Sequence, residues 1–265
     1  MKIGKGKREM SLFNKVLASV GMGSATVNTK LESDKLVPGQ EVKGIVEIKG
    51  GSIDQKINEI YLSLYTTYIK EADEKKYTNN ALIDQVRIND PFVIKKQETK
   101  QIPFSFELPI DTPISLGKTQ IWVATGLDIK NAVDPSDKDF LKVIPDSLTQ
   151  TVLNVINDLG FRLREVECEE APYRLRRRLP FVQEFEFVPI TGSFKGRLDE
   201  LEVLFFPIST TETEIFMQVD RRARGLGGFL AEAFEMDESH VHFTIKSSDL
   251  HSISEKITAM IQRFS

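Results

Sequence analysis

The chain has 265 residues, of which 40% are hydrophobic and 28% are charged, and its formal net charge is −4. This length is enough for two domains that bury about 70 to 75% of their unfolded surface. The small acidic excess argues against a general attraction to nucleic acid, and no apolar run approaches the roughly 20 residues of a membrane-spanning helix. The one cysteine, Cys168, excludes an internal disulfide and fits a reducing compartment, so we expect a cytoplasmic protein.

The first 24 residues are predicted to form a basic tail, residues 1–9, and one amphipathic helix. Gly21 and Gly23 end this helix, whose apolar residues follow the spacing i, i+3, i+4 and i+7: Phe13, Val16, Leu17 and Val20. We expect the stripe to dock on a domain of this chain or on a partner. Because lysines and an arginine precede it, peripheral contact with an anionic membrane is a third alternative.

Residues 25–145 have the pattern of a β-sandwich. Pro38 and Gly39 fit the central positions of a type II turn, and the next residues alternate between apolar and polar as a half-buried strand does. Gly44 in the middle of that strand indicates a bulge or a close backbone approach. Further short strands separated by turn residues complete the predicted sandwich, at 25–31, 57–69, 81–89, 92–94, 104–108, 121–129 and 140–144.

After Pro145 the pattern becomes helical, and we place a linker helix at 146–160. Five more strand patterns predict a second β-sandwich at 161–250, with one amphipathic helix inserted at 226–234. A capping box at Ser252 and Glu255 opens a C-terminal helix at 251–265. Its apolar stripe, which includes Ile257 and Ile261, is expected to cover the second sandwich or to form a homodimer contact.

Several of these segments together resemble a known family: residues 36–50, 102–109, 121–137, 171–180 and 220–225. The chain is similar, from Ser11 to Phe264, to the sporulation-control arrestin-like family of endospore-forming bacteria. The resemblance implies a mainly β protein with two arrestin-like antiparallel β-sandwich domains and short terminal and linker helices. It also implies a regulatory, non-enzymatic role through protein–protein binding, without a cofactor.

Residues with metal-binding chemistry occur in two places, but neither has a recognisable ligand spacing. His240 and His242 would point to one face of a strand, with His251, Asp237 or Glu238 as further ligands, yet satisfied histidines are the favoured interpretation. The aspartates at 134, 137 and 139 lack the glycine and the distal glutamate of an EF-hand. We therefore expect no metal site.

No catalytic constellation stands out. Cys168 lies between two glutamates, whose charges would raise the pKa of its thiol and weaken it as a nucleophile. The chain lacks a Gly-x-Ser-x-Gly motif, and the glycine-rich residues 225–228 match no phosphate-binding fingerprint, although they and Arg221, Arg222 and Arg224 would suit an anion at a helix N-terminus. An unrecognised hydrolase or metal-dependent enzyme is the alternative to a regulator.

The densest basic cluster lies between Pro172 and Pro180 and consists of Arg174, Arg176, Arg177 and Arg178. We expect these arginines to meet Asp137 or Asp139 across the interface between the two domains. The resemblance favours this contact, because arrestins have a polar core between their domains. The alternatives are an external protein partner and phosphate groups, with nucleic acid the least favoured.

Overall fold

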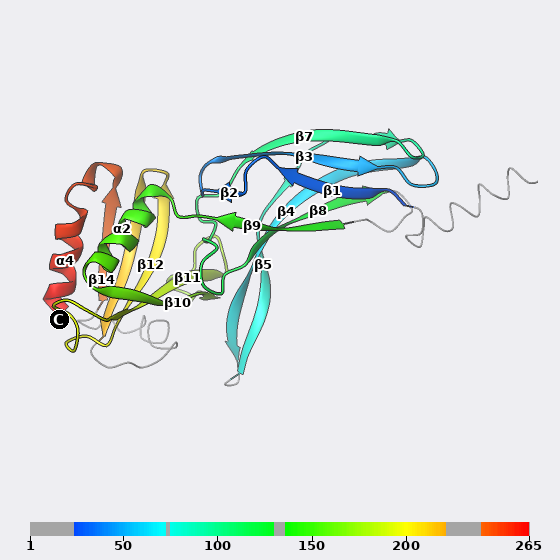
Figure 1. Cartoon of the computed structure of the whole chain (residues 1–265). Helices are drawn as coiled ribbons and strands as arrows, with labels where there is room; N and C mark the ends of the chain where they lie inside the picture. The colour runs from blue at the N-terminus through cyan, green and yellow to red at the C-terminus, as the bar shows by residue number, and fades with distance from the viewer. Residues whose placement is uncertain (1–23, 73–74, 130–135, 221–239, 265) are drawn as a thin grey trace, which may run out of the picture.

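The computed structural model describes residues 24–72, 75–129, 136–220 and 240–264. The stripe at Phe13, Val16, Leu17 and Val20, the expected helix at 226–234 and the arginines at 221, 222 and 224 lie outside the described residues. The described part is mainly β, and its strands extend through both halves of the chain (Figure 1). No helix within it is long and apolar enough to cross a membrane.

The first half is built from two sheets that pack face to face. Three strands form the smaller sheet in the order β1-β3-β7: β1 (Thr26–Leu31), β3 (Glu41–Lys49) and β7 (Thr99–Glu107). They lie over a larger sheet built around β4 (Gln55–Ala72), β8 (Ile121–Ile129) and β9 (Ser136–Val143), as Figure 1 shows. Short β2 (Lys35–Leu36) pairs with β9, while β5 (Lys75–Arg87) and β6 (Phe92–Ile94) pair with β4.

Alternation along these strands explains why the two sheets pack on each other. Val42, Val46 and Ile48 on β3 are buried, and so are Leu62 and Val123 on the larger sheet, so each sheet turns its apolar face inward. The predicted turn is present, with Gly39 at φ 78° and the amide of Gln40 donating to the carbonyl of Val37 at 3.1 Å. The alternation of apolar and polar residues along its strands therefore explains why the first half consists of two packed sheets.

Gly44 is required by a close approach between neighbouring strands. A Cβ atom there would lie 2.5 Å from the carbonyl oxygen of Lys30 and 2.5 Å from the ring of Phe104. Only glycine leaves room at this position for the carbonyl of Lys30 and the ring of Phe104.

The second half consists of one antiparallel sheet with two helices on one face. Its strands follow one another in chain order: β10 (Phe161–Glu170), β11 (Phe181–Pro189), β12 (Glu200–Ser209), β13 (Glu212–Asp220) and β14 (His240–Lys246). Helix α2 (Ser147–Asp158), capped by Asp146, precedes the sheet, and η1 (Ser247–Asp249) and α4 (Ile253–Phe264) follow it.

The described residues of this half thus differ from the second sandwich that the sequence predicts. Helices α2 and α4 occupy the side where a second sheet was expected (Figure 1). Val152 and Ile156 of α2 are buried together with Ile257 and Ile261 of α4, each at most 1% exposed. The helical stripes bury the apolar face of the strands, so no second sheet is needed there. Ile257 and Ile261 of the α4 stripe are buried inside a single chain. These two side chains are therefore not available for a contact with a second copy of the chain.

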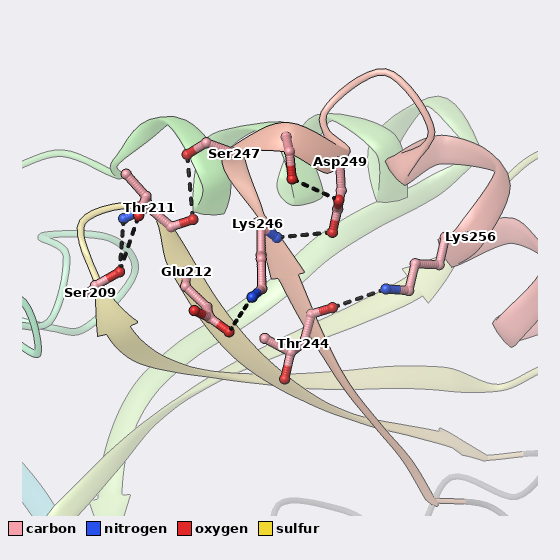
Figure 2. Close-up of polar contacts among 9 residues, drawn as sticks. Ser209, Thr211, Glu212, Thr244, Lys246, Ser247, Asp249 and Lys256 are labelled. Atoms are coloured by element: carbon pink, nitrogen blue, oxygen red, sulfur yellow. Dashed lines mark hydrogen bonds and ion pairs between the residues drawn. The ribbon is translucent and has the colours of Figure 1, made fainter.

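The end of β14 fixes α4 to the sheet (Figure 2). The backbone amide of Lys246 donates to Asp249 at 3.1 Å, and the amine of Lys256 donates to the carbonyl of Thr244 at 2.9 Å. These side chains satisfy backbone groups that an edge strand would otherwise offer to another chain. This end of β14 is therefore closed to strand addition.

The two halves share one continuous sheet. Strand β4 extends beyond the first half and pairs in parallel with β10 through Ile69 and Glu169. Lys70 forms an ion pair with Glu170 at 2.7 Å, and the ring of Tyr68 stacks on that of Phe181. Backbone and side-chain contacts thus hold the junction together.

Candidate functional site

A groove of about 540 Å³ lies at the junction of the two halves. The first half contributes the turn at Pro38 and the segment that follows β7, including Ile110 and Ile114. The second half contributes the loop before β11 and the end of β12, including Leu175 and Phe206. The size and the mainly apolar lining of this junction groove are those of ligand-binding sites in proteins.

A bidentate ion pair closes one side of the junction groove. The guanidinium of Arg178 donates to both carboxylate oxygens of Asp111, at 2.8 and 2.5 Å, and also to the carbonyl of Ile83 on β5. The carboxylate raises the pKa of Arg178, mainly through these hydrogen bonds. Because Asp111 and Ile83 belong to the first half and Arg178 to the second, this contact links the halves.

The other arginines of the cluster lie around the same loop. Arg177 contacts Glu214 of β13 and lies 4.7 Å from the ring centre of Phe206. Glu214 also contacts His242, whose ring stacks on Phe216 at 4.2 Å. Arg174 and Arg176 are exposed. Arg177 and Arg178 therefore line the junction groove, each paired with a carboxylate, whereas Arg174 and Arg176 are not among the residues that line it.

The expected pairing of Arg177 or Arg178 with Asp137 or Asp139 is wrong, because Glu214 and Asp111 occupy those arginines. Asp137 accepts from the amide of Thr29 at 2.9 Å and so satisfies a backbone group of β1. Asp139 also lies on β9, where burial, and next the charge of Asp137, raise its pKa. Both aspartates point toward the smaller sheet of the first half. Their position near the linker in the sequence therefore does not bring them into contact with the second half.

A second polar feature lies on the second-half sheet, on the face opposite α2 and α4. Leu201 and Val203 belong to the core under the helices, so Glu200 and Glu202 point the other way. Strands β10 and β11 repeat this alternation and place Glu165 opposite Glu186 and Glu167 opposite Glu184. Seven residues form this carboxylate face: Glu165, Glu167, Glu169, Glu184, Glu186, Glu200 and Glu202.

Burial dominates the chemistry of the carboxylate face. Five of its residues are at most 7% exposed, and burial raises the pKa of Glu169 to about 7 and of Glu184 to about 8, with neighbouring carboxylates adding to both shifts. Arg164 contacts Glu186 and Glu200, and Lys118 contacts Glu165 and Glu167. This face was not predicted, although Glu-x-Glu repeats in three consecutive strands of the structure carry its signal in the sequence.

Comparison with known proteins identifies the family. Residues 13–223 match the family model described as SpoOM protein. The chain belongs to the Spo0M family. It is 46% identical over 246 residues to the sporulation-control protein Spo0M of Bacillus subtilis strain 168, a match that covers 93% of this chain and 95% of that relative. The resemblance inferred from the sequence motifs is thereby confirmed.

The fold agrees with a solved relative. The crystal structure of Spo0M from Bacillus subtilis superposes with a TM-score of 0.85 at 42% sequence identity, covering 92% of this chain and 100% of that chain. The helix-covered sheet of the second half and the junction with the first therefore belong to an architecture similar to that of Spo0M.

The remaining candidate residues do not come together as a reactive site in the described part of the chain. Cys168 is buried, and burial raises the pKa of its thiol to about 12, so the reactive thiolate is scarce at neutral pH. No group of three His, Cys, Asp or Glu residues among those described is arranged to hold a metal ion. His242 contacts Glu214, and His251 is exposed.

Proposed function

We propose that this chain is a non-enzymatic regulator of sporulation control that works in the cytoplasm by binding a protein partner in the junction groove. The observation that carries the proposal is the groove itself, which has an apolar lining drawn from both halves and arginines on its rim. Family membership supports the link to sporulation control, since the relative is a sporulation-control protein.

The position of the groove suits an arrestin-like regulator. In such an architecture, a partner that contacts both halves has a different affinity for each relative arrangement of the halves. Binding therefore shifts the population toward the arrangement that the partner binds most tightly. The Arg178–Asp111 pair and the Tyr68–Phe181 stack provide contacts that would differ between such arrangements. Regulation by binding requires no reacting group in the groove.

Complementation tests this proposal with one pair of variants. Ile110 lines the groove, whereas Ile208 is 50% exposed and does not line it. In a spore-forming host that lacks its own family member, wild type and Ile208→Glu should restore heat-resistant spores, and Ile110→Glu should not, although it melts at the wild-type temperature. A photo-crosslinking residue at position 110, but not at 208, should capture the partner. Full activity of folded Ile110→Glu would contradict the proposal.

A further inference from the structure

An aromatic row crosses the first half on the outer face of its larger sheet. Strand pairing aligns Leu82 of β5, Tyr65 of β4, Trp122 of β8 and Phe140 of β9. The rings of Tyr65 and Trp122 are 5.7 Å apart, and those of Trp122 and Phe140 are 6.3 Å apart. Phe140 is 63% exposed and Leu82 is 48% exposed, whereas Trp122 is 6% exposed and the amine of Lys138 lies 4.0 Å from its ring centre and 4.9 Å from that of Phe140. The two ends of the aromatic row, Leu82 and Phe140, therefore present apolar surface away from the core of the sandwich.

Small residues lie beside the aromatic row on the same face. Ala124 and Gly126 follow Trp122 at alternate positions of β8, and Ser63 lies opposite Ala124 on β4. A Cβ atom added to Gly126 would meet no atom within 4 Å. The outer face of an antiparallel sheet normally carries polar residues, and contiguous exposed apolar surface marks a contact site. Gln85 donates to Ser63 at 2.8 Å and Lys138 lies opposite Ala124, so the strip of small residues is bordered by these two polar side chains and by the aromatic rings.

The N-terminus enters the structure at the correct end of this sheet. The amide of Ala25 donates to the side chain of Gln55 at 2.7 Å, and Gln55 begins β4 near the end of β8, where Ile57 pairs with Ile129. Strand β1 then runs beside β9, where Thr29 contacts Asp137. The preceding residues thus start next to the edge of the larger sheet.

The length of the N-terminal segment matches the distance it has to cover. Trp122 lies seven positions before Ile129 on β8, which corresponds to about 23 Å along the strand. Ten residues of helix, 11–20, span about 15 Å, and the four residues that follow them reach up to about 13 Å. The helix can therefore extend from the edge of the sheet to the aromatic row.

We propose that residues 11–20 form a helix that lies across the outer face of the larger sheet of the same chain and covers the aromatic row. The predicted apolar stripe of that helix, Phe13, Val16, Leu17 and Val20, would pack on the rings and on the strip beside them. Lys15 is the one charged residue in that segment, so the contact is apolar rather than electrostatic. The inference concerns residues that do not line the junction groove, and it does not depend on the proposed function.

Trp122 is the only tryptophan of the chain, so its fluorescence reports directly on this surface. Leu17→Asp places a charge in the apolar stripe, and Ala18→Asp places the same charge on the opposite side of the helix. We expect Leu17→Asp, and a chain lacking residues 1–20, to show emission shifted to longer wavelength and stronger quenching by acrylamide. Ala18→Asp should match wild type, and a peptide of residues 11–20 should reverse the shift in the truncated chain.

A substitution on the sheet tests the same contact from the other side. Phe140→Ser should release the segment and speed tryptic cleavage at Lys15, whereas Lys142→Ser on the same exposed face of β9 should not. Unchanged fluorescence in Leu17→Asp, or equal cleavage rates in both β9 variants, would overturn the proposal. A shift that depends on protein concentration, together with a dimeric mass for wild type alone, would also overturn it by assigning the helix to a second copy.

Discussion

Replacing Glu184 by glutamine is expected to stabilise the protein increasingly as the pH rises. Glu184 lies on the carboxylate face, 5% exposed, and one of its carboxylate oxygens has no hydrogen-bond partner in the described structure. Burial, and then the charges of Glu169 and Glu200, raise the pKa of Glu184 to about 8 from an ordinary value of 4.5. The folded state therefore holds a proton that the unfolded state releases at neutral pH.

The sign and the size of the effect follow from that shift. A carboxyl group with a raised pKa costs nothing below pH 4.5, and its cost grows as the pH rises toward 8, because the unfolded state gains free energy by releasing a proton that the folded state retains. Each unit of pKa shift corresponds to about 1.4 kcal/mol, so the full cost is of the order of 4 to 5 kcal/mol. Glutamine has the same shape and carries no charge, and it removes this cost.

Urea unfolding of wild type and Glu184→Gln at pH 5 and pH 9 measures the effect. The free energy of unfolding of the variant should exceed that of wild type by about 1 kcal/mol at pH 5 and by several times more at pH 9. Glu212→Gln is the matched control, because Glu212 forms a surface ion pair with Lys246 at 3.4 Å. An equal difference at both pH values would refute the assignment of a buried, protonated carboxyl group to Glu184.

Three further predictions concern the junction, the core and the thiol. A double-mutant cycle of Arg178→Met and Asp111→Asn should give a coupling energy of about 1 to 2 kcal/mol, because the bidentate pair is half-buried. Ile257→Ala should lower the free energy of unfolding by about 2 to 5 kcal/mol, since this side chain of α4 is fully buried. Cys168 should react with a thiol reagent only at the rate of unfolding, because it is buried and its pKa is raised to about 12.

Each of these measurements has a control in the same molecule. Combining Arg178→Met with Asp137→Asn should give no coupling, because Asp137 contacts Thr29 within the first half. Gln262→Ala on the exposed side of α4 should cost far less than Ile257→Ala. Reaction of Cys168 in the folded protein would contradict the burial of its thiol.

Local pattern in the sequence determined much of the fold. The alternation around Val42 and Val46, the turn at Pro38 and the helical stripes that became α2 and α4 all follow from spacings that fix which side chains share a face. The glycine at position 44 also indicated a close backbone approach, and the structure shows the backbone carbonyl of Lys30 there. The motifs identified the family, which the comparisons confirm.

Only the tertiary structure decided which faces and charges meet. Helices α2 and α4 cover the apolar face of the second-half sheet, whereas the sequence predicted another sheet there. Arg178 pairs with Asp111, 67 positions away in sequence, and strand pairing gathers Glu184, Glu186 and Glu202 on one buried face. The spacing of residues fixes the face of an element on which each side chain lies. The element that packs against that face is set by long-range contacts, which local periodicity does not record.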